Sequence, residues 1–372
     1  MTTTQRVTFP SRGLQIAANL FLPPPEAQLP DRKHAAVIVG HQGTGIKEQA
    51  SGLYAETLAT AGYVALAFDA AHWGESEGIP RGLEDPSQRV EDFKCAVTFL
   101  SQLGNTVVDP SRIGVVGICA SGGYSFFAAA TDVRIKAIAG ISPMCNGTFA
   151  RAGLKDPATG IINRETLNQQ LAYAANCRLE EAKGHPAPVH NALDGLASVF
   201  SNPKEDIKGY YSSPLWRHPR CTNEMVIRSV ELLVPFDAFQ HIEWISPRPV
   251  LFVAGSEAVT MPFVKEAYER ALEPKELVIV PGKYHVDLYQ DISETGPKLV
   301  SFFAESLYDA DGTILASSAV AYKHVENERR NTRETNLDAQ PESMYSANYH
   351  GHREDRREAQ AGRLLFFRLE LF

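Results

Sequence analysis

The sequence has few cysteines, and they form no recognisable pattern. Its 372 residues include five, at Cys95, Cys119, Cys145, Cys177 and Cys221. Their odd number and wide scatter lack the paired spacing of a zinc site or a disulfide framework. We therefore expect no bound metal, free thiols and a reducing compartment. In such a compartment the sequon Asn146-Gly147-Thr148 should be unused.

The sequence also lacks an excess of basic residues and any long apolar run. Lys and Arg number 36 against 44 Asp and Glu, a formal net charge of −8. Duplex nucleic acid and polyphosphate surfaces need a basic patch, so neither is an expected partner. No run approaches the ~18 apolar residues of a membrane span. Residues 1–6 are not followed by the apolar stretch of a signal peptide. We expect a cytoplasmic protein.

What the sequence does contain is an alternation of short apolar runs with helical patterns. At 44% hydrophobic residues the chain can bury a core of its own. The expected strands are Arg6–Phe9, Leu14–Phe21, Ala35–Gly40, Val64–Phe68, Ile113–Gly117, Ala137–Ser142, Val250–Gly255 and Leu277–Val280. The expected helices between them include Gln49–Ala61, Gln88–Leu103, Gly122–Ala130 and Val264–Leu272.

These runs predict an α/β fold with an eight-stranded, mostly parallel sheet flanked by helices. The first two strands should form an antiparallel hairpin across Ser11-Arg12-Gly13. The later strands are nearly all apolar, as is typical of parallel strands buried on both faces.

Two segments interrupt the alternation. Residues 145–239 lie between two strands and are too many for a loop. They contain helical stretches (Arg164–Lys183, Thr222–Leu233) and the aromatic residues Tyr210, Tyr211 and Trp216, so we interpret them as a mostly helical lid over the active edge of the sheet. Residues 317–372 are dense in charge and nearly free of apolar periodicity, which predicts a disordered tail. The folded domain is then 1–316.

The most informative stretch is residues 112–124, RIGVVGICASGGY. A sharp turn from strand to helix needs small residues around a nucleophile at its tip, because the two backbones nearly touch. Cys119 at the tip puts Gly117, Ser121 and Gly122 at those places. Ser121 at the tip is the alternative, but it puts Tyr124 where a small residue is needed. We favour Cys119 and keep Ser121 as the second reading.

A thiol suits this position. A helix N-terminus and a neighbouring imidazole both stabilise a thiolate, so we expect a lowered pKa. The backbone N–H of Ala120 would point at a developing oxyanion. The second donor should come from the loop Gly40–Gly45, where the backbone N–H of Gln42 or Gly43 is the candidate.

The base and its orienting acid should follow the last two strands. His285 comes just after Leu277–Val280 and is the expected base. The loop after Val250–Gly255 offers Glu257 as the acid, with Asp237 as the alternative. Asp287, two residues beyond the base, is expected to cap the final helix instead.

Three further side chains are candidates for lining a substrate pocket. His41 belongs to the loop Gly40–Gly45, and His72 and Trp73 follow the fourth strand. A loop packed for structural reasons would explain His72 and Trp73 equally well.

Taken together, the runs Gly117–Tyr124, Gly255–Ala258 and His285–Tyr289 resemble the α/β-hydrolase superfamily, and more closely its dienelactone-hydrolase-like branch with a cysteine at the elbow. They are similar to a bacterial and fungal subgroup that includes hydrolases and polyketide transferases of secondary-metabolite clusters. The resemblance spans about residues 5–308 and implies Cys119 as nucleophile, His285 as base and no cofactor. Acids of this family are usually aspartates, so Glu257 departs from the pattern.

The expected function is acyl transfer from an ester or thioester through a Cys-acyl intermediate. The substrate would be a small acyl compound, free or carrier-bound, and the acceptor water or an alcohol; the sequence leaves a homodimer open. One rival is a catalytically silent hydrolase fold that only binds. A dinucleotide-dependent oxidoreductase is another, but Gly40, Gly43 and Gly45 give GxxGxG rather than GxGxxG.

Overall fold

The computed structural model describes residues 1–152, 161–194 and 207–307. The predicted tail at 317–372 lies outside these residues, as does part of the predicted lid. Within the described ranges, none of the helices has the length and apolar character that crossing a membrane requires.

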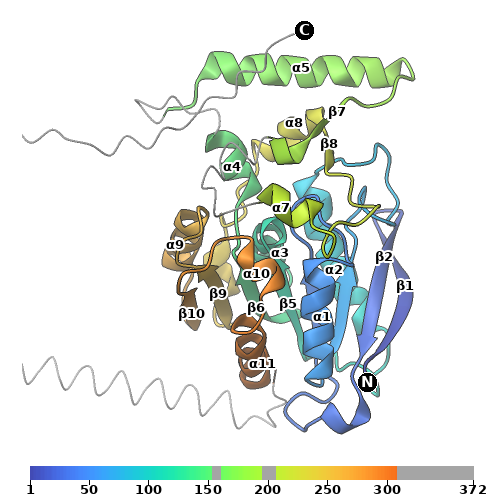
Figure 1. Cartoon of the computed structure of the whole chain (residues 1–372), viewed down its shortest axis with the longest axis vertical. Helices are drawn as coiled ribbons and strands as arrows, with labels where there is room; N and C mark the ends of the chain where they lie inside the picture. The colour runs from blue at the N-terminus through green and yellow to red at the C-terminus, as the bar shows by residue number, and fades with distance from the viewer. Residues whose placement is uncertain (153–160, 195–206, 308–372) are drawn as a thin grey trace, which may run out of the picture. The chain divides into compact units, whose positions relative to one another are not determined.

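One sheet of eight strands organises the molecule, in the order β1-β2-β4-β3-β5-β6-β9-β10 (Figure 1). Its strands are β1 Thr3–Ser11, β2 Leu14–Leu22, β3 Ala36–Gly40, β4 Val64–Phe68, β5 Ile113–Ile118, β6 Ile135–Ile141, β9 Val250–Gly255 and β10 Lys275–Val280. All eight predicted strands are present, with ends shifted by three residues or fewer. The predicted fold class is therefore confirmed.

The sheet is parallel from β4 to β10, and β1 and β2 are antiparallel at one edge. Every residue of β3, β4, β5 and β9 is buried, because helices cover both faces. The β1–β2 hairpin turns at Arg12 and Gly13, which have φ of 46° and 83°. Two positive φ values are what a two-residue hairpin turn requires.

Helices cover the sheet. They are α1 Ala50–Thr60, α2 Pro86–Ser101, α3 Ala120–Thr131, α9 Met261–Arg270, α10 Asp287–Gln290 and α11 Thr295–Ser306, with a short 3₁₀ turn η1 at Pro25–Ala27. Helix α1 packs on α11, and α2 packs on α3. Asp85 starts α2 by accepting the amides of Ser87 and Gln88, and Pro86 occupies the first turn, where no amide is needed.

The segment between β6 and β9 carries several short elements. They are α4 Asn146–Ala152, α5 Arg164–Ala182, β7 Val189–Asn191, α7 Ile207–Ser212, β8 Glu224–Val226, η2 Ile227–Ser229, α8 Val230–Leu233 and η3 Ile242–Ile245. The predicted helix Arg164–Lys183 is confirmed as α5. The predicted helix Thr222–Leu233 is wrong in its first half, because Asn223 has φ of 58° and Glu224–Val226 pairs antiparallel with β7. Here pairing with β7 outweighs the local helical propensity of the segment.

Candidate active site

Cys119 stands at the tip of the turn between β5 and α3. Its backbone has φ of 55° and ψ of −115°, a conformation that non-glycine residues rarely adopt and that is typical of functional sites. Hydrogen bonds hold it there: its amide donates to the Ile141 carbonyl at 2.9 Å, and its carbonyl accepts from the amides of Gly122 and Met144. The structure therefore places Cys119, rather than Ser121, at the elbow tip.

The small residues around the tip are required by contact. A Cβ added at Gly117 would lie 2.2 Å from the Ser125 hydroxyl and 2.4 Å from the Ser121 carbonyl. One added at Gly122 would lie 2.4 Å from the Pro143 side chain. Ser121 itself is 2% exposed and donates its hydroxyl to the His41 carbonyl. Its position is that of a structural link between α3 and the loop after β3.

Two backbone amides converge on the Cys119 sulfur. They belong to Gly43, in the loop after β3, and to Ala120, the first residue of α3. Donors from these two places form the oxyanion hole of a strand–helix nucleophile elbow. Of the two candidate donors in the loop after β3, Gln42 and Gly43, the Gly43 amide hydrogen-bonds to the Cys119 sulfur. The Gln42 carbonyl accepts hydrogen bonds from the His41 ring and the Gly45 amide.

Burial decides the protonation of the thiol. Cys119 is 8% exposed, and desolvation raises its pKa above the usual value, against the lowering effect of the Tyr289 hydroxyl and the two amides. The sequence analysis expected the opposite direction from the helix N-terminus and the imidazole. That expectation was wrong because it left out the burial of the site under aromatic side chains.

The predicted base, His285, is connected to Cys119 through the side chain of Tyr289. Its Nε2 is 2.8 Å from the Tyr289 hydroxyl, and that hydroxyl also hydrogen-bonds to Cys119. Its Nδ1 is 2.6 Å from the Thr260 hydroxyl. The ring is fully buried, and burial lowers the pKa of His285 to about 3. The imidazole is thus neutral at rest.

The structure brings neither proposed acid to the imidazole. Glu257 is exposed and accepts a hydrogen bond from the adjacent Ser256 hydroxyl at 2.9 Å. Asp237 accepts the Phe239 amide and pairs with Arg270 at 3.7 Å. The Thr260 hydroxyl occupies the place at the His285 Nδ1 where Glu257 was expected. The loop after β9 turns Glu257 outward and Thr260 inward, which spacing along the chain did not show.

His41 is a structural residue rather than a pocket wall. It is fully buried, its Nδ1 contacts the Gln42 carbonyl at 2.7 Å, and its Nε2 lies near the Ala70 amide and the Arg89 guanidinium at 3.1 and 3.0 Å. Burial and the Arg89 charge lower the pKa of His41 well below its usual value. Both ring nitrogens are used in contacts that join the loops after β3 and β4 to α2, and none of these contacts supports the expected role in the pocket.

His72 and Trp73 also belong to a packed loop. His72 has φ of 71°, and its Nδ1 lies 3.0 Å from the Pro80 carbonyl. Trp73 is 4% exposed and belongs to the hydrophobic core. The structure gives neither side chain a contact with the nucleophile, so the structural interpretation of this loop fits better than the pocket one.

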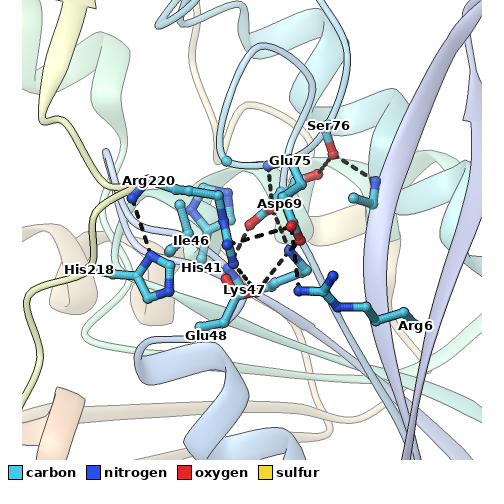
Figure 2. Close-up of polar contacts among 12 residues, drawn as sticks. Arg6, His41, Ile46, Lys47, Glu48, Asp69, Glu75, Ser76, His218 and Arg220 are labelled. Atoms are coloured by element: carbon cyan, nitrogen blue, oxygen red, sulfur yellow. Dashed lines mark hydrogen bonds and ion pairs between the residues drawn. The ribbon is translucent and has the colours of Figure 1, made fainter.

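A buried charge network lies beside the loop that carries Gly43 (Figure 2). Lys47, 1% exposed, contacts Asp69 at 2.8 Å, Glu75 at 2.6 Å and Glu48 at 2.9 Å. Burial disfavours the ammonium, but the three carboxylates outweigh it and raise the pKa of Lys47. Asp69 also accepts the Lys47 amide at 2.7 Å, so the network fixes the loop's backbone as well as its side chain.

The inserted segment joins this network and closes over the site. Arg220 contacts Glu48 at 2.6 Å and Glu75 at 3.5 Å. Tyr211 donates its hydroxyl to the Gly43 carbonyl at 2.6 Å. Tyr210 stacks on Trp216 and meets Tyr289 edge to face. The predicted lid thus supplies aromatic residues directly above Gly43 and Tyr289.

Thr260, Tyr289, Lys47 and Asp69 are site residues to which sequence reasoning assigned no role. Tyr289 stands four residues after His285, and Thr260 starts α9, but neither spacing is specific to catalysis. The described ranges hold no group of three or more His, Cys, Asp or Glu side chains that could bind a metal ion.

Comparison with known proteins places the chain in a family. A family model described as serine aminopeptidase, S33 (Hydrolase_4) matches residues 32–291. The uncharacterized protein PA2218 of Pseudomonas aeruginosa is 39% identical over 312 residues, which span 82% of this chain and 81% of that protein. Its crystal structure has a TM-score of 0.72 at 34% identity and covers 82% of this chain and 94% of that one.

Two fungal proteins are also similar. Thiohydrolase aneE of Aspergillus aculeatus is 26% identical over 294 residues, spanning 78% of this chain and 86% of that protein. The crystal structure of the α/β hydrolase GrgF from Penicillium sp. sh18 has a TM-score of 0.68 at 21% identity, covering 82% and 100% of the two chains. The expected resemblance is confirmed. The chain belongs to the α/β-hydrolase family described as serine aminopeptidase, S33, and is an enzyme of the ester or thioester hydrolase and acyltransferase type.

Proposed function

We propose that this enzyme transfers an acyl group from an ester or thioester through a covalent thioester on Cys119. The family's description names serine, but the elbow tip of this chain is a cysteine. Two backbone donors are aimed at the sulfur, and His285 stands one hydroxyl away. The convergence of the Gly43 and Ala120 amides on Cys119 is the observation that carries the proposal.

The proposed steps follow from this geometry. The sulfur attacks the acyl carbonyl while the thiol proton moves to the His285 side of the site. The Gly43 and Ala120 amides stabilise the tetrahedral oxyanion. Collapse expels the leaving alcohol or thiol, which takes a proton from the imidazolium, and leaves the acyl group on sulfur. Water or an alcohol then attacks the thioester and gives its proton to His285. Collapse of the second tetrahedral intermediate breaks the C–S bond, releases the acid or ester, and returns the proton from the imidazolium to the Cys119 sulfur.

The acceptor depends on how well the inserted segment excludes water. Tyr210 and Tyr211 of that segment are 4% and 6% exposed, and Cys119 and His285 are buried as well. A water-excluding site favours transfer to a bound alcohol over hydrolysis. Relatives are described as a thiohydrolase and, for GrgF, a polyketide transferase. We extend this to a polyketide-type acyl substrate, free or carrier-bound, in secondary-metabolite biosynthesis.

Intact-protein mass spectrometry tests the proposal. The full chain is incubated with a panel of acyl thioesters and esters, and each adduct is located by peptide mapping. We expect one acyl adduct, on Cys119, that is lost in Cys119→Ala and is released by water or an alcohol. No adduct with any panel member, or an adduct on Ser121, would overturn the proposal; the first result would favour the silent binding protein.

A further inference from the structure

The Tyr289 hydroxyl connects the nucleophile to the base. It lies 2.8 Å from the His285 Nε2 and hydrogen-bonds to the Cys119 thiol. In the arrangement usual for a nucleophile–base pair, the base reaches the nucleophile directly. Here a phenol hydroxyl makes both contacts, and its side chain is 1% exposed. A proton that leaves the sulfur toward Nε2 therefore meets the Tyr289 oxygen first.

Packing fixes the Tyr289 ring in this position. The ring meets His285 edge to face at 5.4 Å and Tyr210 edge to face at 5.2 Å. Its backbone belongs to α10, and the Tyr289 amide donates to the Val286 carbonyl at 3.0 Å. The hydroxyl is thus held on a rigid element, as a relay between two reacting groups requires.

The hydrogen-bond partners allow a proton arrangement that links the three groups. The Cys119 thiol also lies 3.5 Å from the Met144 sulfur, which is a weak acceptor. With the Nδ1 proton of His285 donated to the Thr260 hydroxyl, Nε2 is an acceptor. The Tyr289 O–H can then donate to Nε2, and its oxygen can accept the Cys119 S–H. Burial favours the neutral form of all three groups: it lowers the pKa of His285 and raises the pKa values of Cys119 and Tyr289. Before the reaction, the Cys119 thiol, the Tyr289 hydroxyl and the His285 imidazole are then all uncharged.

We propose that Tyr289 is a catalytic proton relay: as the Cys119 sulfur bonds to the acyl carbon, the thiol proton passes to the Tyr289 oxygen and the Tyr289 proton passes to Nε2 of His285. The S–H and O–H bonds break while new O–H and N–H bonds form, so Tyr289 ends the step neutral. The products are a tetrahedral oxyanion and an imidazolium. This inference rests on the proposed function, because it assumes that Cys119 is the nucleophile.

The test measures the acylation step itself. Single-turnover acylation of Cys119 by an acyl thioester is followed by intact mass for the full-length wild type, Tyr289→Phe and Tyr63→Phe. Tyr63 is a matched control, because its buried hydroxyl donates to the Val300 carbonyl, outside the site. We expect Tyr289→Phe to slow acylation by about 30-fold or more, since one positioned proton-transfer group contributes on the order of 10² to 10⁴. Tyr63→Phe should acylate at the wild-type rate.

A proton inventory provides a readout that a structural role would not move. In mixtures of H₂O and D₂O, the wild-type acylation rate should curve with deuterium content, because two protons move together. Tyr289→Phe should give a straight line. A linear wild-type inventory, or a Tyr289→Phe rate close to wild type, would overturn the relay while leaving Cys119 as nucleophile. A wild type that forms no adduct on Cys119 would overturn both. If Tyr289→Phe fails to fold, the wild-type proton inventory by itself still tests the relay.

Discussion

The Ser121 hydroxyl donates a hydrogen bond to the backbone carbonyl of His41. This bond joins the first turn of α3 to the loop that carries Gly43, two residues further along. The two amides that meet at the Cys119 sulfur come from these two elements, and one buried side chain holds them in register. Ser121 thus has a role at the elbow that does not require it to be the nucleophile.

Cys119→Ala should abolish turnover, and Ser121→Ala should retain more than about a tenth of it. Loss of the Ser121 hydroxyl leaves the His41 carbonyl without this donor, at a cost of about 1–3 kcal/mol in the free energy of unfolding. Steady-state assays and thermal melts separate the two effects. If Ser121→Ala is as inactive as Cys119→Ala while still folded, Ser121 takes part in the reaction.

Thr260→Val should reduce kcat/KM by roughly 10- to 100-fold, because it removes the hydroxyl at the Nδ1 of His285 while keeping the shape of the side chain. His285→Ala should lose on the order of 10³ or more. Glu257→Gln should stay within about threefold of wild type, since its side chain faces solvent. A strong loss in Glu257→Gln with a normal Thr260→Val would show that Glu257 reaches the imidazole during turnover.

Lys47→Met should destabilise the protein by about 3–5 kcal/mol, because it leaves the buried Asp69 carboxylate without its cation. The loop that carries Gly43 should loosen too, so kcat should fall more than substrate affinity. The control is Lys183→Met, which removes an exposed lysine paired with Glu180 on α5 and should leave the melting temperature within about a degree. Equal effects of the two substitutions would refute a special role for the buried network.

Acidification should destabilise the fold between pH 7 and pH 5. His41 and His285, like His72 and His190, have lowered pKa values when folded, so below about pH 6.5 the unfolded chain binds more protons at these histidines than the folded chain does. Asp92, whose pKa burial raises to about 6, acts in the opposite direction, because the folded chain binds its proton first. The histidines outnumber Asp92, so the net effect of acidification should be a loss of stability.

Urea unfolding at several pH values measures this dependence. His41→Asn keeps an acceptor and a donor at the same site without a titrating ring. The variant should lose less stability than wild type between pH 7 and pH 5. An unchanged pH dependence would mean that His41 is already protonated in the folded protein.

The local sequence determined the sheet, the elbow and the base. The apolar runs of β3, β5 and β9 could be read directly, because parallel strands covered on both faces leave no room for polar side chains. The elbow position of Cys119 followed from the small residues Gly117 and Gly122, since a Cβ added at either would lie 2.2 or 2.4 Å from a neighbouring side-chain atom. His285 followed from its place after the last strand.

Only the tertiary structure decided what surrounds these groups. The pKa of Cys119 depends on its burial in the folded protein, so the helix N-terminus alone predicted the wrong direction. The loop after β9 offered both Glu257 and Thr260, and its turn in space selected Thr260 for the imidazole. The place of Tyr289 between sulfur and imidazole likewise arises where the segment after β10 contacts the turn after β5. Contacts between distant segments depend on tertiary packing, which cannot be predicted from the spacing of residues along the sequence.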